Sequence, residues 1–246
     1  MPKVSIIIPA YNEEAFIGKL LECILQVDIH SIGFEREVIV VDNGSHDRTS
    51  EIVKQFAEVR LFRIEANKGK GDGVRLGIRK ATGDYILIQD SDLEYDPHDY
   101  IPMLKAVLSA KTPTAIYGSR ILGEIEVNGR SFFPGKNKDK SVATWVANFI
   151  LSLWAKVLFG QWITDTLTGY KIYPTNILQD FNIKTTGFET DHEITAKLIL
   201  SGVSIIEIPV SYSPRTVQEG KKIRCSDFFV ALLTFLRFRF TPRKNF

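Results

Sequence analysis

Cysteine is scarce in this sequence, and neither sign of charge dominates it. The two cysteines, Cys23 and Cys225, are far apart and lack the close spacing of metal ligands, which argues against a disulfide framework and a zinc site. A formal net charge of +2, from 31 basic and 29 acidic residues, gives no broad basic surface for nucleic acid. We therefore expect a protein of a reducing compartment, with no nucleic-acid partner, that meets anions only through local groups of basic residues.

A signal peptide and a membrane-spanning run are also lacking. Residues 1–14 read MPKVSIIIPAYNEE, a short apolar run followed by charge, which is typical of a first strand rather than of a signal peptide. The longest apolar segment, residues 141–159, contains Asn148 and Lys156 and falls short of the about 20 apolar residues that a bilayer requires. We expect a cytoplasmic protein with one sizeable α/β core and a C-terminal extension.

Apolar runs of strand length alternate with segments of helical periodicity through the first half of the chain. The runs are rich in Ile and Val, which favours parallel strands with helices on both faces of the sheet. The expected strands are 4–8, 37–41, 60–64, 85–88 and 115–117, and the expected helices are 15–25, 47–56, 74–80 and 98–108. Ligands of such sheets bind beyond the carboxyl ends of the strands, where the polar segments 9–13, 42–45 and 89–92 lie.

The second half begins with a change of pattern. Residues 121–140 are rich in Gly, Asn and charge, which is typical of a mobile loop. Residues 141–159 are predicted to form an amphipathic helix. Its polar stripe consists of Thr144, Asn148, Ser152 and Lys156. A second alternation follows, with strands expected at 168–173 and 204–210 and a helix at 189–200.

Two aspartates, Asp90 and Asp92, directly follow the strand expected at 85–88, with Ser91 between them. Carboxylates this close raise each other's pKa and repel unless a cation neutralises them. A hard divalent ion, bound by one or two carboxylates and by substrate phosphates, fits this arrangement. Such an ion would stabilise the charge that develops on a diphosphate leaving group. The alternative is a solvated acidic turn that caps the helix beginning near Pro97.

A glycine-rich segment, Gly69 to Gly73, precedes an expected helix but matches neither the dinucleotide fingerprint nor the P-loop. We interpret it as a loop that brings Lys70 near a diphosphate, the alternative being a plain helix entry. Serines at strand ends lack a paired histidine, and the four histidines form no metal cluster in the sequence. A serine hydrolase and a zinc enzyme are therefore not expected.

Four motifs together carry a resemblance to a known family: PAYNE at 9–13, VDNGS at 41–45, NKGKG at 67–71 and DSD at 90–92. The combination resembles the inverting family-two glycosyltransferases, most closely the branch with dolichyl-phosphate mannose and polyprenyl-phosphate glucose synthases. The resemblance covers nearly the whole chain. It implies the GT-A fold, a Rossmann-like, mostly parallel central sheet with helices on both faces. It also implies transfer of a sugar from a GDP- or UDP-linked donor.

The resemblance further implies roles for individual residues at the donor site. Pro9, Tyr11 and Glu13 would help to hold the nucleotide, and Asp42 would lie near the base. Asp90 and Asp92 would serve the ribose and a Mg²⁺ or Mn²⁺ ion, with Glu94 as a third metal ligand. The chain departs from the family at Asn43, where a second Asp is frequent; an amide adds an NH₂ donor, so the identity of the base stays open.

Further motifs lie in the half that would bind the acceptor, at 118–120, 165–171, 188–189 and 215–222. Their basic residues suit phosphate oxygens, whereas the alternative for each is an ordinary surface charge. These basic residues are Arg120, Arg215, Lys221 and Lys222. The resemblance implies a polyprenyl or dolichyl monophosphate acceptor, whose anionic oxygen needs no strong base. Asp191 keeps a hydroxyl acceptor open, because a carboxylate there would act as a general base.

The implied organisation is a catalytic domain over 1–215, followed by a basic, aromatic extension over 216–246. Residues 1–119 would form the nucleotide-sugar half and 120–215 the acceptor half. In the helix at 141–159, Trp145 and Trp154 suit the headgroup level of a membrane, so we expect peripheral binding to the cytoplasmic face. Packing of this helix and the tail on the core is the alternative. Transfer to a saccharide hydroxyl and a non-catalytic sugar-nucleotide binding subunit are the alternative functions.

Overall fold

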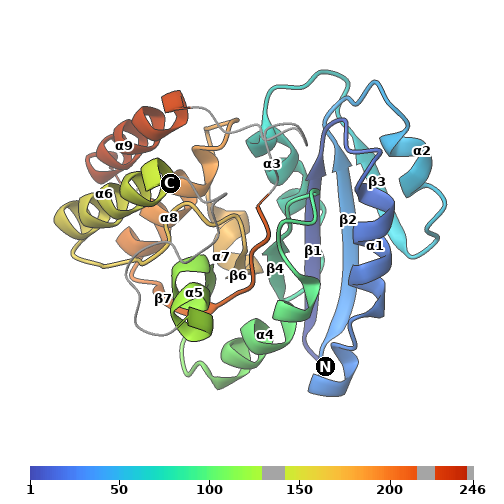
Figure 1. Ribbon diagram of the computed structural model, residues 1–246, viewed down its shortest axis with the longest axis horizontal. Coiled ribbons are helices and arrows are strands. Elements are labelled where there is room, and N and C mark those ends of the chain that lie inside the picture. Colours follow the sequence, from blue (N-terminus) through green and yellow to red (C-terminus); the bar gives the residue numbers. More distant parts are fainter. Residues whose placement is uncertain (129–141, 215–224, 243–246) are drawn as a thin grey trace.

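The computed structural model describes residues 1–128, 142–214 and 225–242. A seven-stranded sheet in the order β3-β2-β1-β4-β6-β5-β7 runs through the described part of the molecule (Figure 1). The strands are β1 (Lys3–Ala10), β2 (Glu35–Asp42), β3 (Val59–Arg63), β4 (Tyr85–Ile88), β5 (Thr114–Ser119), β6 (Lys171–Pro174) and β7 (Ser204–Pro209). The mostly parallel sheet and the α/β class agree with the expectation from the sequence.

Parallel pairing brings the ends of three strands to one edge of the sheet. β1 pairs in parallel with both β2 and β4, and Ala10 lies opposite Asp42 in the register. β6 is the exception in the sheet, because it runs antiparallel to its neighbours β4 and β5. The segments that follow β1, β2 and β4 therefore emerge side by side, as the strand-end rule predicts.

Helices cover both faces of the sheet, and each face has its own apolar cluster. Helices α1 and α4 pack on one face, where α1 presents apolar residues at helical spacing. Helices α3, α7 and α8 pack on the other face. The helices of this part of the fold are α1 (Ile17–Gln26), α2 (Thr49–Val53), α3 (Lys70–Lys80), α4 (Tyr100–Ser109), α7 (Thr175–Asp180) and α8 (Thr190–Leu200), with 3₁₀ turns η1 (His30–Ile32) and η2 (Pro97–Asp99).

Helix α3 lies unusually close to the sheet because of its glycines. A Cβ atom added at Gly77 would lie 2.3 Å from the Cγ2 atom of Ile7 in β1, closer than van der Waals contact allows. Gly69 just precedes the helix with φ at +116°, and a Cβ there would lie 2.5 Å from the carbonyl oxygen of Thr186. These close approaches fix the N-terminus of α3 at the edge where β1 and β2 end.

A third layer consists of α6 (Val142–Phe159) and α9 (Cys225–Arg239), which pack on each other and on α8. Figure 1 shows the two helices side by side at the edge of the molecule, away from β1 and β2. The described part of the tail is thus largely a helix packed on the body, as expected from the alternative interpretation of the sequence. Trp154 donates from Nε1 to the carbonyl of Leu232 at 3.2 Å, so it lies against α9.

The prediction of a mobile loop over 121–140 is wrong for the first part of that segment. Residues Arg120–Asn128 form helix α5, which packs against β7. Gly123 permits this contact, because a Cβ there would lie 2.2 Å from the carbonyl oxygen of Val210. In the sequence a glycine at this position is typical of a loop, whereas in the structure it allows close packing of a helix. The remaining residues of that segment, 129–140, lie outside the described part of the chain.

No helix in the described ranges is long and apolar enough to cross a bilayer.

His192 in α8 gives a prediction about stability. Its side chain is buried beside Phe235 of α9, with ring centroids 5.0 Å apart, and neither ring nitrogen has a hydrogen-bond partner among the described residues. Burial, aided by the charge of Lys171, lowers the pKa of His192 to about 4. Because the folded-state pKa lies below the unfolded one, the stabilisation is complete above about pH 6.5 and is lost as pH falls toward 4.

We expect His192→Leu to remove this part of the acid sensitivity. Urea titrations should show that the wild type loses roughly 2 kcal/mol more unfolding free energy than the variant between pH 7 and pH 5. His30→Leu, at an exposed position, is the control and should follow the wild type. Equal losses in the wild type and His192→Leu would contradict the assignment.

Candidate functional site

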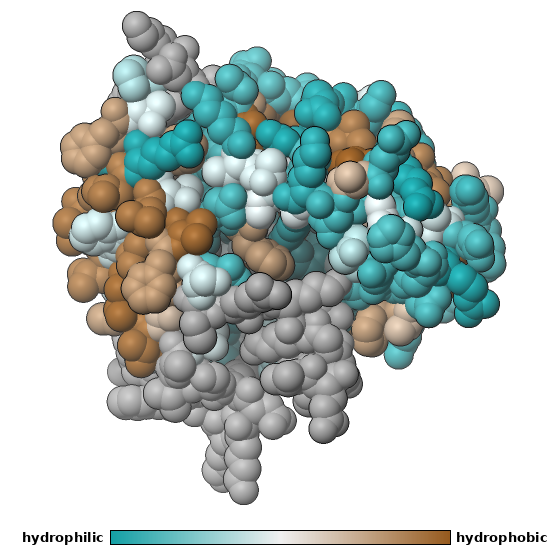
Figure 2. Space-filling view, turned by 90° about the horizontal axis from the view of Figure 1, so that it is seen from above, coloured by the Kyte–Doolittle hydropathy of each residue, from teal (hydrophilic) through white to brown (hydrophobic). Residues whose placement is uncertain are grey.

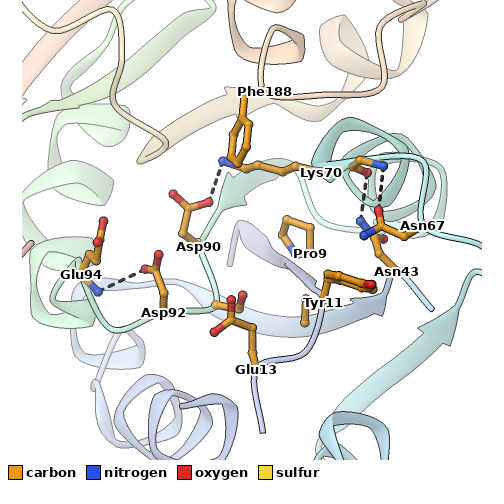
Figure 3. Close-up of a pocket in the computed structure, with 13 residues that line it drawn as sticks. Pro9, Tyr11, Glu13, Asn43, Asn67, Lys70, Asp90, Asp92, Glu94 and Phe188 are labelled. Carbon is orange, nitrogen blue, oxygen red and sulfur yellow. Dashed lines mark hydrogen bonds and ion pairs between the residues drawn. The ribbon is translucent and has the colours of Figure 1, made fainter. Parts of the chain in front are cut away.

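A pocket lies at the edge of the sheet where β1, β2 and β4 end (Figure 3). Its lining comes from segments far apart in the sequence, including the N-terminus of α3 and the segment before α8. The lining residues are Pro9, Ala10, Tyr11, Glu13, Asn43, Asn67, Gly69, Lys70, Asp90, Ser91, Asp92, Glu94 and Phe188.

Most of the donor-site residues expected from the sequence line this one pocket. Pro9, Tyr11, Glu13, Asn43, Lys70, Asp90, Ser91, Asp92 and Glu94 are all among the lining residues. Asp42, Arg120 and Asp191 are not among them, and Arg215, Lys221 and Lys222 lie outside the described residues. The structure thus gathers the expected nucleotide and metal groups, while roles for them remain predictions.

Lys70 is the central cation of the pocket. Its Nζ atom lies 2.6 Å from Oδ1 of Asp90 and 3.5 Å from Oδ2 of Asp191, and Figure 3 shows it pointing at Asp90 beside the ring of Phe188. Burial alone would lower the pKa of Lys70, but the charges of Asp90 and Asp191 outweigh it and raise the pKa above its ordinary value. Lys70 therefore stays charged, and it lies at a helix N-terminus, where anions are favoured.

Gly169 makes room for this ion pair. A Cβ atom added there would lie 2.4 Å from Oδ2 of Asp90 and 3.2 Å from Nζ of Lys70. The segment before β6 thus packs directly on the pair, and any other residue would push Asp90 away. The glycine belongs to the motif at 165–171, for which the sequence indicated a role in the acceptor half and not on the donor side.

Asp191 lies between two lysines. Besides the contact with Lys70, the Oδ1 atom of Asp191 lies 3.9 Å from the Nζ atom of Lys171. Burial would raise the pKa of Asp191, but the charges of Lys70 and Lys171 lower it below the usual value. Lys171 itself is fully buried, and burial lowers its pKa although Asp191 partly opposes this. The carboxylate is thus held ionised, and its lowered pKa makes it a weak proton acceptor.

Asp92 and Glu94 belong to a tight turn beside the pair. The backbone N–H of Glu94 donates to Oδ1 of Asp92 at 3.2 Å, a contact visible in Figure 3. The residue between them, Leu93, has φ at +57°, a left-handed conformation that L side chains disfavour. Both residues line the pocket, on either side of this strained position.

The donor atoms fit a hard divalent ion that also binds a diphosphate. Within the described ranges, no three His, Cys, Asp or Glu side chains lie together as a metal-binding group. Magnesium-type ions are often bound by one or two carboxylates together with substrate phosphates. Asp90 is engaged by Lys70, and Asp92, which lines the same pocket, is the carboxylate to which the family resemblance assigns the ion. Such an ion, when bound, neutralises charge that develops on a departing phosphate.

Asp42, which the resemblance places near the base, is not among the residues that line the pocket. It is fully buried, and its carboxylate accepts from the backbone N–H of Ser45 at 2.7 Å and from the hydroxyl of Ser50. The neighbouring Asn43 is the residue of this motif that lines the pocket, with Nδ2 donating to the carbonyl of Gly69 at 3.1 Å. Asp42 thus shapes the turn after β2, and Asn43 links it to α3.

Arg120 also has a partner that the sequence did not reveal. Its guanidinium donates to both carboxylate oxygens of Asp165, at 2.7 and 2.8 Å, and its Cζ atom lies 4.9 Å from the centre of the Tyr212 ring. Asp165 is fully buried. The expected phosphate ligand is thus engaged in a bidentate ion pair, which is a strong and geometrically specific contact.

Sequence reasoning assigned no donor-site role to Asn67, Gly69 or Phe188, although all three line the pocket. Asn67 and Gly69 belong to the motif at 67–71, from which the sequence predicts a contact only for Lys70. Phe188 is separated from Lys70 by more than 100 residues in the sequence, and the lysine Nζ lies 6.0 Å from its ring centre. Only the fold brings these residues together.

Comparison with known proteins decides the family. Residues 5–146, more than half of the chain, match the family model of glycosyl transferase family 2. The chain belongs to this family. The resemblance predicted from the motifs is therefore confirmed, and the pocket of this family-2 glycosyltransferase lies within the matched region except for Phe188.

Two relatives, both archaeal, have names that state an activity. The low-salt glycan biosynthesis hexosyltransferase Agl6 of Haloferax volcanii is 29% identical over 215 residues, which cover 87% of this chain and 48% of Agl6. The dolichol-phosphate mannosyltransferase of Pyrococcus furiosus is 28% identical over 222 residues, which cover 89% of this chain and 59% of that protein. The chain thus spans about half the length of these two relatives.

Solved structures confirm the GT-A fold. Glucosyl-3-phosphoglycerate synthase from Mycobacterium tuberculosis matches with a TM-score of 0.72 at 19% identity, covering 98% of this chain and 82% of that chain. A crystal structure of the same enzyme with Mn²⁺, UDP-glucose and phosphoglyceric acid matches with a TM-score of 0.68 at 17% identity. At this identity the likeness shows the fold alone.

Lys70→Met is expected to weaken binding of a sugar nucleotide at least tenfold, because a charge-assisted contact is lost and Asp90 is left without its cation. Isothermal titration with UDP-glucose and GDP-mannose measures this effect. Lys68→Met, which changes an exposed lysine of the same loop, is the matched control and should bind as the wild type does. Unchanged affinity in Lys70→Met would show that the cation does not serve the donor.

Proposed function

We propose that this family-2 glycosyltransferase is a hexosyltransferase that uses a GDP- or UDP-linked sugar and a Mg²⁺ or Mn²⁺ ion. The acceptor is a polyprenyl or dolichyl monophosphate at the cytoplasmic face of a membrane, and the anomeric carbon is inverted. The names of the two archaeal relatives support hexosyl transfer, and one of them names a dolichol phosphate. The structures of the mycobacterial enzyme with Mn²⁺ and UDP-glucose support the ion and the donor class.

The observation that carries the lipid acceptor is the orientation of α6. Its polar residues turn inward: Asn148 is buried, donates to the carbonyl of Thr164 at 2.7 Å and accepts from the N–H of Thr166 at 3.0 Å. Ser152 is buried in the same row and bonds back to the carbonyl of Asn148. The stripe predicted from the sequence thus includes two residues that face the protein, so the helix directs its apolar side outward.

The outward side of α6 continues across α9 as one apolar surface, the α6–α9 face. Figure 2 shows hydrophobic side chains along the edge of the molecule where Figure 1 places these helices. Its exposed members are Val146, Phe149, Ile150, Leu153 and Val157 of α6 and Phe229, Val230, Leu233 and Leu236 of α9. Contiguous exposed apolar surface of this kind marks an interaction site.

A lipid surface suits the α6–α9 face better than a soluble saccharide does. Exposed basic residues, Lys156, Arg237 and Arg239, lie on the same two helices, and such residues favour anionic headgroups. Trp145 stacks on the exposed Phe149, with ring centroids 6.0 Å apart, which suits the interfacial layer of a membrane. The face would hold the enzyme where a lipid-linked acceptor is found.

The neighbourhood of Asp191 also favours an anionic acceptor. A general base for a sugar hydroxyl should have a pKa near the working pH, whereas Lys70 and Lys171 lower the pKa of Asp191. A monophosphate oxygen is already anionic and needs no proton acceptor. Transfer to a saccharide hydroxyl stays the alternative, because Lys70 contacts both Asp90 and Asp191 and so places the Asp191 carboxylate next to the pocket. A non-catalytic sugar-nucleotide binding subunit is the alternative from another class.

The expected contacts of Arg215, Lys221 and Lys222 with the acceptor phosphate remain predictions from the resemblance. Arg120 is better placed as a support, because both oxygens of Asp165 engage its guanidinium. The acceptor phosphate would then be bound by other basic residues of the chain.

Release of UDP or GDP from a panel of sugar nucleotides tests the function. With Mn²⁺, we expect release that depends on polyprenyl phosphate in detergent. Asp92→Asn should lower this release at least 100-fold because the ion loses one of its protein carboxylates, whereas Asp180→Asn, at an exposed aspartate, should not. Release only with soluble sugars would favour the hydroxyl acceptor, and no release with any acceptor would favour the binding subunit.

Charge placed on the α6–α9 face tests the membrane contact. Val157→Glu and Leu233→Glu change side chains that are 66% and 64% exposed, and each should lower sedimentation with vesicles of phosphatidylcholine and phosphatidylserine about tenfold or more. The matched control is Leu108→Glu, at a 53% exposed leucine of α4, which should sediment as the wild type does. Equal binding by all three variants would exclude this face as the membrane contact.

A further inference from the structure

The turn from Asp92 to Glu94 is held in a conformation that it would not adopt by itself. Leu93 has φ at +57°, in the left-handed region where a leucine side chain meets its own backbone. Such backbone strain persists only when surrounding contacts fix it, and it is frequent at functional sites. The contacts that fix this turn therefore help to set the positions of the Asp92 and Glu94 carboxylates.

A segment after β7 supplies those contacts; we call residues Ser211–Ser213 the strap. The backbone N–H of Ser213 donates to the carbonyl of Glu94 at 2.9 Å, and the hydroxyl of Tyr212 donates to Oε2 of Glu94 at 2.6 Å. An isolated β-bridge joins Tyr212 to Tyr95. The strap thus contacts both the backbone and the side chain of Glu94, whose own N–H donates to Asp92.

The Tyr212 ring is fixed on two sides. The ring of Tyr95 lies 5.2 Å away between centroids, and the Arg120 guanidinium lies 4.9 Å from the ring centre. Asp165 holds that guanidinium by two hydrogen bonds, which leaves it little freedom to turn toward a ligand. A cation is attracted to the face of an aromatic ring, and Asp165 keeps the Arg120 guanidinium over the Tyr212 ring. Arg120 and Asp165 together therefore support Tyr212.

We propose that Tyr212 is a positioning residue for the divalent ion, and that Arg120 acts through it rather than by binding the acceptor. The hydroxyl orients the Glu94 carboxylate, and the strap fixes the turn that presents Asp92. Groups that orient metal ligands in this way strongly affect metal affinity. This inference rests on the proposed function, because it needs an ion at Asp92 and Glu94.

The test is Mn²⁺ binding by the full chain in the presence of UDP or GDP. Electron paramagnetic resonance of the free ion measures the amount that stays unbound. Tyr212→Phe keeps the ring and removes the hydroxyl, and it should raise the Mn²⁺ dissociation constant about 10-fold to 100-fold. Tyr170→Phe is the matched control, since it removes a hydroxyl that donates to the carbonyl of Asp96 within the same group of tyrosines. Its Mn²⁺ affinity should equal that of the wild type, and nucleotide affinity without metal should not change in either variant.

Arg120→Lys leaves the hydroxyl in place and provides a second test that does not depend on the stability of Tyr212→Phe. It should also weaken Mn²⁺ binding, because a lysine cannot form the bidentate contact with Asp165. A higher acceptor KM with unchanged Mn²⁺ affinity would overturn the role given to Arg120. If the wild type binds Mn²⁺ and Tyr212→Phe has the same Mn²⁺ dissociation constant as Tyr170→Phe, the role of Tyr212 is overturned while the proposed metal site stands. No Mn²⁺ binding by the wild type with either nucleotide would overturn both the inference and the proposed metal site.

Discussion

The pocket of this family-2 glycosyltransferase depends on one largely buried cation, Lys70. Its Nζ atom lies 2.6 Å from Asp90 and 3.5 Å from Asp191, and its loss would leave Asp90 without this counter-charge and Asp191 with Lys171 alone. The contact joins three parts of the chain that are distant in sequence: the start of α3, the end of β4 and the start of α8. Glycines make it possible, since Gly69 and Gly169 allow backbone to approach where a Cβ would collide.

From this pair the structure extends in two directions. Toward one side, the parallel register of β1, β2 and β4 places Pro9, Asn43 and Asp92 around the same pocket. Toward the other side, the helix that carries Asp191 packs on α9, and α9 packs on α6. The donor pocket and the α6–α9 face therefore belong to one packed body.

Local patterns predicted the elements well, because Ile- and Val-rich runs bounded by polar strand ends have few alternatives. The strand 85–88 matches β4, and the rule that ligands bind at strand ends led to most of the pocket residues. Family resemblance, more than spacing, supplied the roles of Tyr11 and Glu13. Pairs of residues that are distant in the sequence could not be predicted from local patterns. Arg120 contacts Asp165, which is 45 residues away in the sequence, and Tyr212 contacts Glu94, which is 118 residues away. A polar stripe also does not reveal which way it faces, so the inward turn of Asn148 emerged only from the packing of α6.

Whether the hexose goes to a lipid phosphate is tested most directly by mass spectrometry of the reaction products after extraction into organic solvent, with polyprenyl phosphate and a saccharide offered together. We expect one hexose added to the polyprenyl phosphate, with an anomeric configuration opposite to that of the donor. Hexose found only on the saccharide, in the aqueous phase, would contradict this expectation.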